Sequence, residues 1–176
     1  MRPIWRLCAT TVTALTLTTT AVTNGAARVE VGFHLMNVHS RKCLTVTGGA
    51  VTDNSIVIQK ACGRDLSSLW RFRPVLLTGS VRIVNVRSGK CLTIAGGGVA
   101  DNGLAVLHAC DRDAARRWVL HRPAGVPRTA AVLENANSRK CLTIAGGGAG
   151  ENGVAVQYAC DDEQSRRWTV RPATAK

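Results

Sequence analysis

The chain repeats one sequence pattern three times, and this repetition constrains its architecture more than any other feature. In each repeat an Asn leads within a few residues into Lys-Cys-Leu-Thr followed by Val or Ile. The first cysteine is followed by a second cysteine 19 residues later and by a tryptophan 27 residues later. The three sets are Cys43, Cys62 and Trp70; Cys91, Cys110 and Trp118; and Cys141, Cys160 and Trp168. A repeat of this kind is one supersecondary unit that needs its neighbours to bury its apolar face.

The start of the chain has the layout of a secretory signal peptide. Arg2 and Arg6 precede an uncharged stretch that extends to Val22, and small residues follow up to Ala27. We therefore predict cleavage after Ala27, with the neighbouring positions as alternatives, and an extracellular, secreted protein. A membrane anchor is the alternative, but the stretch is rich in threonine and short for the roughly 20 apolar residues of a span. No later run is long and apolar enough, so we predict no membrane span in the mature chain.

The chain is strongly basic, with 23 Lys and Arg against 11 Asp and Glu and a net charge of +12. Removal of Arg2 and Arg6 with the signal leaves 21 basic residues against 11 acidic ones, a net charge of +10. Such a field favours anionic surfaces of any kind. Because the basic residues are spread over all three repeats, they predict a solvated surface and no specific nucleic-acid site, with an anionic polymer as an alternative partner.

The six cysteines of the mature chain fall into three pairs of equal spacing. Six cysteines permit 15 pairings, and the repeat favours the one that joins the two cysteines within each repeat. Each disulfide would close a loop of about 20 residues and stabilise the fold by roughly 3 kcal/mol. The alternative, a zinc site, is disfavoured because the pairs lack the short C-x₂₋₄-C spacing. We predict no metal and no cofactor.

The pattern within each repeat predicts an all-β domain. In the second repeat, residues 81–86, 90–94, 104–109 and 117–120 have the composition or alternation of short strands, with glycine- and asparagine-rich turns between them. Four strands in each of three repeats predict 12 strands that share one core about a pseudo-threefold axis, which describes a β-trefoil. A propeller is the alternative, but three blades are fewer than the usual four to eight. The expected boundaries are 1–27 for the signal, 28–176 for the trefoil, and about 32–79, 80–127 and 128–176 for its repeats.

The motifs also resemble a known family, the ricin B-type lectin domain, of the kind that actinobacteria secrete. The resemblance lies in Cys-Leu-Thr-Ile-Ala-Gly-Gly, Asp-Asn-Gly, Val-Gln-Tyr-Ala-Cys-Asp and Arg-Arg-Trp, and it extends from about Gly32 to Pro172. It implies binding of glycans or cell-surface polysaccharide in up to three shallow pockets, one per repeat, without catalysis.

The resemblance implies a set of pocket positions, and this chain departs from it at several of them. The aspartate that accepts hydrogen bonds from sugar hydroxyls is replaced by Thr45, Thr93 and Thr143. The stacking aromatic is replaced by Lys60 and His108, whereas Tyr158 keeps it. The glutamine that orients the aspartate is replaced by Ser68, Arg116 and Arg166, and the asparagine before it by Ser67, Ala115 and Ser165. A charged acceptor forms hydrogen bonds roughly twice as strong as a neutral hydroxyl does, so the usual clamp is weakened.

Two hypotheses follow from these departures. Either the trefoil is a degenerate scaffold that binds a protein or an anionic polymer, or a pocket has been rebuilt from other residues. For a rebuilt pocket the third repeat is the first choice and the second repeat the next. The predicted ligand-binding residues are Thr143, Glu151, Asn152, Gln157, Tyr158 and Asp161 in the third repeat, and Thr93, Asp101, Asn102, His108 and Asp111 in the second. The alternative interpretation of the Asp-Asn and Glu-Asn pairs is turn chemistry.

The patterns of common catalytic sites do not occur in the sequence. The glycine runs 96–98 and 146–148 are not followed by Gly-Lys-Ser/Thr, so they are not phosphate-binding loops. No serine lies in a nucleophile elbow, and no two histidines are four residues apart. We therefore predict a protein that is not an enzyme.

Overall fold

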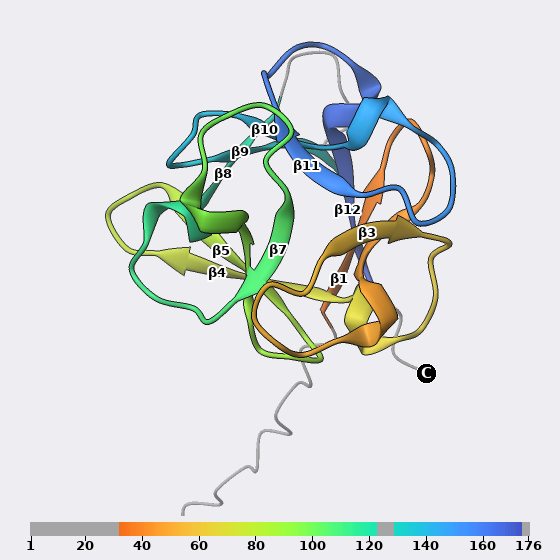
Figure 1. The fold of residues 1–176 in the computed structure, drawn as a ribbon, viewed down its shortest axis with the longest axis horizontal. Helices are drawn as coiled ribbons and strands as arrows, with labels where there is room; N and C mark the ends of the chain where they lie inside the picture. Colours follow the sequence, from red (N-terminus) through yellow and green to blue (C-terminus); the bar gives the residue numbers. More distant parts are fainter. Residues whose placement is uncertain (1–31, 123–128, 174–176) are drawn as a thin grey trace, which may run out of the picture.

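A computed structural model of the chain describes residues 32–122 and 129–173, and these form a β-trefoil (Figure 1). The predicted signal peptide lies outside the described residues. The described residues contain twelve strands, as the repeat predicts, and also six one-turn 3₁₀ helices that the sequence did not predict. The strands of the first repeat are β1 (Phe33–Asn37), β2 (Cys43–Val46), β3 (Val57–Lys60) and β4 (Trp70–Val75). Those of the second are β5 (Ser80–Asn85), β6 (Cys91–Ile94), β7 (Ala105–His108) and β8 (Trp118–His121). Those of the third are β9 (Ala130–Asn135), β10 (Cys141–Ile144), β11 (Ala155–Tyr158) and β12 (Arg167–Pro172).

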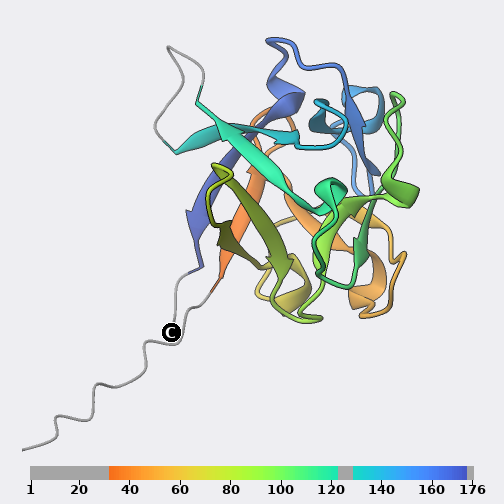
Figure 2. The same ribbon diagram turned by 90° about the vertical axis from the view of Figure 1, so that its left-hand side faces the viewer.

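Six of these strands close a barrel. The first and fourth strands of the repeats pair in the cyclic order β1, β4, β5, β8, β9, β12 and back to β1, always antiparallel. In Figure 2, β1 and β12 lie side by side, which brings the two described ends of the chain together. Closure leaves the barrel without a free edge along these strands, which removes the usual template for aggregation.

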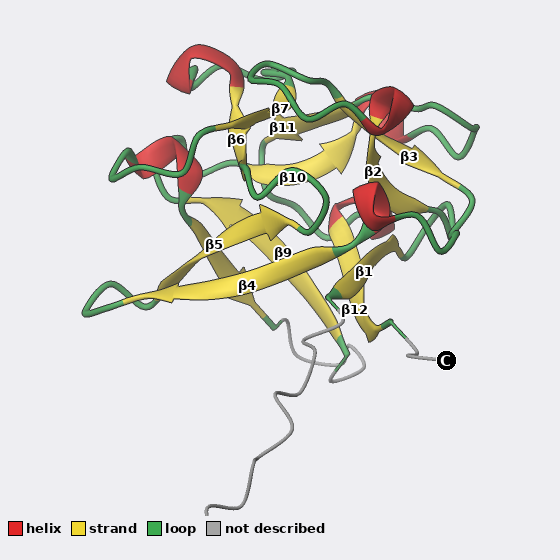
Figure 3. Cartoon of the chain, turned by 90° about the horizontal axis from the view of Figure 1, so that it is seen from below, coloured by secondary structure: helices red, strands yellow, loops and turns green. Residues whose placement is uncertain are grey.

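The other six strands form three hairpins that cover one end of the barrel. They are β2–β3, β6–β7 and β10–β11. Figure 1 looks onto this end, where β3, β7 and β11 surround the threefold centre. The 3₁₀ helices lie at the periphery of the hairpins in Figure 3: η1 (Thr47–Gly49), η3 (Ala95–Gly97) and η5 (Ala145–Gly147) follow the second strands, and η2 (Leu66–Ser68), η4 (Ala114–Arg116) and η6 (Gln164–Arg166) precede the fourth.

The core is built from the same positions of each repeat. The repeat tryptophans Trp70, Trp118 and Trp168 are fully buried, as predicted. Each indole Nε1 donates a hydrogen bond to the backbone oxygen of the leucine after the first cysteine, at 2.9 Å in all three repeats. The polar group of the tryptophan is therefore satisfied inside an apolar core, which is the condition for burying it without a penalty. Leu, Ile, Val and Ala from the first three strands of each repeat fill the remaining space.

The three predicted disulfides are confirmed. They join Cys43 to Cys62, Cys91 to Cys110 and Cys141 to Cys160. Each connects the start of the second strand to the loop after the third strand. The two strands of each hairpin share only four residue pairs, so the disulfide adds a covalent link at the end of a short hairpin. Within the described residues, no helix is long and apolar enough to cross a membrane.

We expect Trp118→Ala to destabilise the protein by about 3–5 kcal/mol, because it leaves a cavity in the core and an unpaired carbonyl oxygen at Leu92. Chemical denaturation at fixed pH measures this loss. Tyr158→Ala is the matched control, because Tyr158 is 37% exposed and the loss of its ring should cost about 1 kcal/mol or less. Equal losses in the two variants would contradict the assignment of the tryptophans to one shared core.

Candidate functional site

Three repeat-related pockets lie at the outer side of the cap hairpins. We call them the first, second and third pockets, after the repeat that supplies most of their lining, and their volumes are 350, 240 and 280 Å³. Each is bounded by the threonine two residues after the first cysteine, the glycines of the following 3₁₀ helix, and the residue two positions before the second cysteine. The pocket positions that the resemblance implies therefore do come together in space.

Each pocket also contains an asparagine from the preceding repeat in the cyclic order. Asn102 of the second repeat lines the third pocket, Asn152 of the third lines the first, and Asn54 of the first lines the second. The sequence predicted that Asn102 shares a pocket with His108 and that Asn152 shares one with Tyr158. The structure separates both groups, because the Asp-Asn turns reach across to the neighbouring repeat.

Backbone pairing holds these turns in place. The three asparagines have positive φ angles of 61–63°, which asparagine tolerates better than most residues with a side chain do. Their N–H groups donate to the third strand of the next repeat: Asn54 to Leu107, Asn102 to Gln157 and Asn152 to Gln59, at 2.8–2.9 Å. The asparagines are therefore turn residues as well as pocket residues, and the turn holds each amide side chain at its pocket.

The acidic residue before each asparagine bonds to the next repeat rather than entering a pocket. Asp53 pairs with Lys90 at 2.8 Å, Asp101 with Lys140 at 2.7 Å and Glu151 with Lys42 at 2.8 Å. We call these three pairs the inter-repeat ion pairs. The hydrogen bond from Lys90 is the largest cause of the lowered pKa of Asp53. Likewise Lys42, and then the backbone N–H of Ala61, lower the pKa of Glu151.

Gln157 is also placed away from the pocket. Its side chain is fully buried, donates to the backbone oxygens of Gly98 at 2.9 Å and Ala100 at 2.8 Å, and accepts from Ser138 Oγ. Successive side chains of a strand point to opposite faces, so Gln157 cannot share a pocket wall with its neighbour Tyr158. Gln59 makes the equivalent bonds to Gly148 and Gly150. Both glutamines join neighbouring repeats.

The pocket floors carry a hydroxyl group that is already hydrogen-bonded. Thr45 shares a hydrogen bond with the hydroxyl of Ser67 at 3.1 Å, and Thr143 donates to the backbone oxygen of Ser165 at 3.1 Å. Thr93 donates to the backbone oxygen of Ala115 at 3.0 Å. A threonine at this position therefore connects the second strand to the 3₁₀ helix before the tryptophan and leaves lone pairs on its oxygen.

Two buried arginines occupy the position of the family's glutamine, and their role was missed at the sequence level. Arg166 pairs with Asp161 at 3.0 Å and Glu163 at 2.9 Å, and its Nε donates to the backbone oxygen of Ala159 at 2.8 Å. Its guanidinium lies over the Tyr158 ring, 5.1 Å from the centroid. Asp161 is thus engaged by Arg166. The sequence does contain a signal for this arrangement. In the second and third repeats, acidic residues stand one and three positions after the second cysteine, and an arginine stands six positions after that cysteine.

The second pocket repeats this arrangement with a smaller ring. Arg116 pairs with Asp111 at 3.0 Å and Asp113 at 2.8 Å, and its Nη2 lies 2.8 Å from Nδ1 of His108. The backbone N–H of Ala115 is the largest cause of the lowered pKa of Asp113, and Arg116 lowers it further. Asp111 is engaged by the arginine just as Asp161 is.

The third pocket therefore combines four kinds of group at one opening. Tyr158, a residue that is 37% exposed, supplies an aromatic ring, Asn102 an amide, Arg166 a guanidinium and Glu163 a carboxylate. Glu163 lies on the loop before η6 and was not predicted to line the pocket. Gly146 and Gly147, with φ of 61° and 65°, form a wall without side chains. Among the described residues no group of His, Cys, Asp and Glu is arranged to hold a metal ion.

Comparison with known proteins identifies relatives of this architecture. The chain matches the family model described as ricin-type beta-trefoil lectin domain-like over residues 23–109, 66–157 and 114–176. No curated protein matches the chain.

Several solved structures share the fold. A designed threefold-symmetric protein, ThreeFoil, has a TM-score of 0.75 at 21% identity, covering 79% of this chain and 96% of that one. The Rhizoctonia solani agglutinin has a TM-score of 0.71 at 15% identity, covering 81% and 96%. The C-terminal half of an earthworm R-type lectin, solved with GalNAc, has a TM-score of 0.62 at 12% identity, covering 80% and 98%. At these identities the likeness demonstrates the fold.

We expect the inter-repeat ion pairs to make the fold acid-sensitive. Because the pKa values of Asp53 and Glu151 are lowered in the folded protein, their stabilisation is present above the ordinary values of 3.8 and 4.5 and is lost as the pH falls through the lower folded values. The denaturation midpoint should therefore decrease as the pH is lowered from about 6 to about 3, and decrease less in Asp53→Asn/Glu151→Gln. Some sensitivity should persist in that variant, because the pKa values of Asp65 and Asp113 are lowered too. The same pH dependence in the variant and the wild type would contradict this assignment.

Proposed function

Because this chain belongs to the ricin-type β-trefoil lectin domain-like family, we propose that it is a non-catalytic carbohydrate-binding module whose third pocket binds a neutral sugar. The observation that carries this proposal is the exposed ring of Tyr158 at the opening of a pocket that also presents a carboxylate, a guanidinium and an amide. The lectins of known structure that share the fold support carbohydrate as the class of ligand.

The sugar's apolar face would lie against the ring of Tyr158. The guanidinium of Arg166, 5.1 Å from the ring centroid, covers part of that ring and fixes its orientation. An oriented ring loses little freedom on binding, and this pre-organisation favours affinity. Tyr158 is therefore assigned the stacking role that the sequence predicted for it.

The polar groups of the third pocket would replace the missing aspartate. Glu163 Oε2 accepts from Arg166 Nη1 at 2.9 Å, and the carboxylate side chain is 65% exposed, so it keeps capacity to accept from sugar hydroxyls. Thr143 contributes its remaining lone pairs, and Asn102 can both donate and accept. The acceptor thus comes from the loop before η6, whereas the family places it after the first cysteine. Gln157, Glu151 and Asp161 bond elsewhere, and Asn152 lines the first pocket, so none of the four contacts the sugar in this proposal.

Tyr158→Ala should abolish binding of a neutral sugar, because it removes the single tyrosine of the chain and with it the stacking platform of the third pocket. The measurement is a glycan array with the oxidised mature protein, followed by titration calorimetry with the best neutral ligand. A stacked ring is worth about 1 kcal/mol or more beyond its buried area, so residual binding within about fivefold of the wild-type affinity would contradict the stacking role. His108→Ala, at the equivalent position of the second repeat, is the control and should bind like the wild type.

Asn102→Gly tests whether the second repeat contributes to the third pocket, and Asn152→Gly is its matched control. Glycine tolerates the positive φ of both positions, so each substitution removes only the amide side chain. Asn102→Gly should weaken neutral-sugar binding, while Asn152→Gly should leave it unchanged. An unchanged affinity in Tyr158→Ala would refute the third-pocket proposal whatever the asparagine variants do.

We further propose that the protein is secreted after removal of residues 1–27. The three disulfides support this location, because disulfides form and persist in oxidising compartments. Expression of the full chain in a secreting bacterial host should release a protein whose mass corresponds to residues 28–176 with six oxidised cysteines. Retention of the full chain inside the cell would contradict this proposal.

A further inference from the structure

We infer that the first pocket is a second binding site with a different ligand class: an acidic saccharide that carries a carboxylate or a sulfate group. This inference rests on the proposed function to the extent that both pockets recognise carbohydrate. The inferred site differs from that of the proposed function in its pocket, in its binding residues and in the charge of its ligand. The three pockets are related by the repeat, yet the first is the one in which the buried arginine and its ion pairs are missing.

The loss of the arginine is a coordinated change. Where the other repeats have Arg116 and Arg166, the first repeat has Ser68, whose hydroxyl donates to the backbone oxygen of Asp65 at 2.8 Å. Where they have Asp111 and Asp161, it has Gly63. The first pocket is accordingly the largest of the three, at 350 Å³ against 240 and 280 Å³, and this volume lies in the range of small-ligand sites.

Two cations line the space that the arginine leaves. Lys60 stands at the position of Tyr158, and Arg64 two residues after the second cysteine, and both side chains are exposed. Within the described part of the chain neither has a hydrogen bond or an ion pair with another side chain. The charge of Lys60 contributes to the lowered pKa of Glu151, but the Glu151 carboxylate already bonds to Lys42 at 2.8 Å and to the backbone N–H of Ala61 at 3.1 Å.

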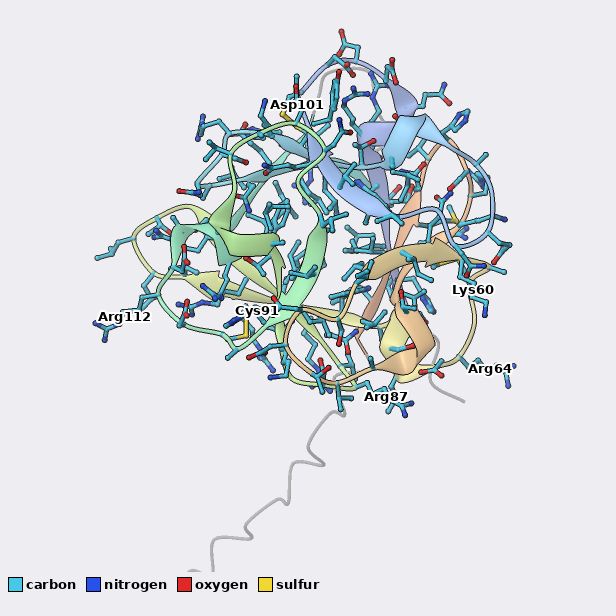
Figure 4. All side chains as sticks on the ribbon, viewed as in Figure 1. Lys60, Arg64, Arg87, Cys91, Asp101 and Arg112 are labelled. Carbon is cyan, nitrogen blue, oxygen red and sulfur yellow. A yellow bond between two sulfur atoms is a disulfide. The ribbon has the colours of Figure 1, made fainter. Side chains whose placement is uncertain are left out.

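The remaining charges near the first pocket leave it positive. Asp65 is the acid that lines it, and Asp65 Oδ1 already accepts from the backbone N–H of Ser67 at 2.8 Å and lies 3.6 Å from Arg87. The Arg87 guanidinium packs beside Gly49, a wall residue of the pocket. Figure 4 shows Lys60, Arg64 and Arg87 along one edge of the molecule, over the first repeat. The lining of the first pocket therefore has two cations, Lys60 and Arg64, and one carboxylate, Asp65, which already has a hydrogen bond and the nearby Arg87.

The rest of the lining suits a sugar better than a bare anion. The hydroxyls of Thr45 and Ser67 share a single hydrogen bond at 3.1 Å, so each keeps capacity for a ligand hydroxyl. Asn152 adds an amide that can donate and accept. Lysine and arginine on the opening would pair with the anionic substituent through charge-assisted hydrogen bonds, which are about twice as strong as neutral ones. In this pocket the charged group would take the place of ring stacking.

The test uses a panel of disaccharides, each in a neutral, a uronic acid and a 6-sulfated form, titrated against the mature protein. The wild type should bind at least one acidic form about tenfold more tightly than its neutral partner, a difference of about 1.4 kcal/mol. Lys60→Gln/Arg64→Gln should remove that preference. The control Arg112→Gln/Arg122→Gln should keep it, because it removes the same charge at exposed sites outside the first pocket, and Arg112 is the repeat equivalent of Arg64.

Each outcome decides the inference. No preference for any acidic form in the wild type, or a preference that survives Lys60→Gln/Arg64→Gln, would overturn it. Equal losses in both double variants would overturn it as well, since binding would then depend on net charge alone. Comparison of the uronic acid and sulfated arms identifies which anionic group is bound. Tyr158→Ala separates this inference from the proposed function, because it should remove neutral-sugar binding and leave the acidic preference intact.

Discussion

The structure depends on the pairing between the turn of one repeat and the third strand of the next. The backbone bonds of Asn54, Asn102 and Asn152 to the following repeat close the three hairpins into a ring. The inter-repeat ion pairs and the buried glutamines Gln59 and Gln157 reinforce the same contacts. A single repeat has neither a partner for its turn nor cover for its tryptophan. The threefold arrangement therefore stabilises the fold and also assembles each pocket from two repeats.

The sequence predicted the features whose causes lie within one repeat. The spacing of the two cysteines is such a feature, and so is the fixed separation between the first cysteine and the tryptophan. The disulfides, the core tryptophans and the trefoil were therefore predicted correctly. The residues that line each pocket were not predicted correctly, because the lining depends on contacts between repeats. Nothing local to Asn102 indicates that it lies beside Thr143 rather than Thr93. The placement of Gln157 is a different kind of error, since strand alternation already assigns it and Tyr158 to opposite faces.

The arginines explain how a trefoil of this family keeps ordered pockets without the usual aspartate and glutamine. A buried guanidinium needs paired and hydrogen-bonded partners, and Arg166 has two carboxylates and one backbone carbonyl. The same group that orders the loop also lies over Tyr158. Ordering of the pocket and positioning of the ring are thus one interaction, whereas in the family pattern separate residues orient the aspartate and stack on the sugar.

This coupling also explains why the first repeat differs at several positions together. Loss of the arginine alone would leave unpaired carboxylates at the pocket, and loss of the carboxylates alone would leave a buried unpaired charge, which is strongly destabilising. In the first repeat Ser68 replaces the arginine and Gly63 replaces the aspartate that pairs with it in the other repeats. The core is unaffected, because Trp70 and Leu44 keep the contacts that their equivalents have in the other repeats. A symmetric core with separable pocket residues therefore lets one chain carry pockets of different charge.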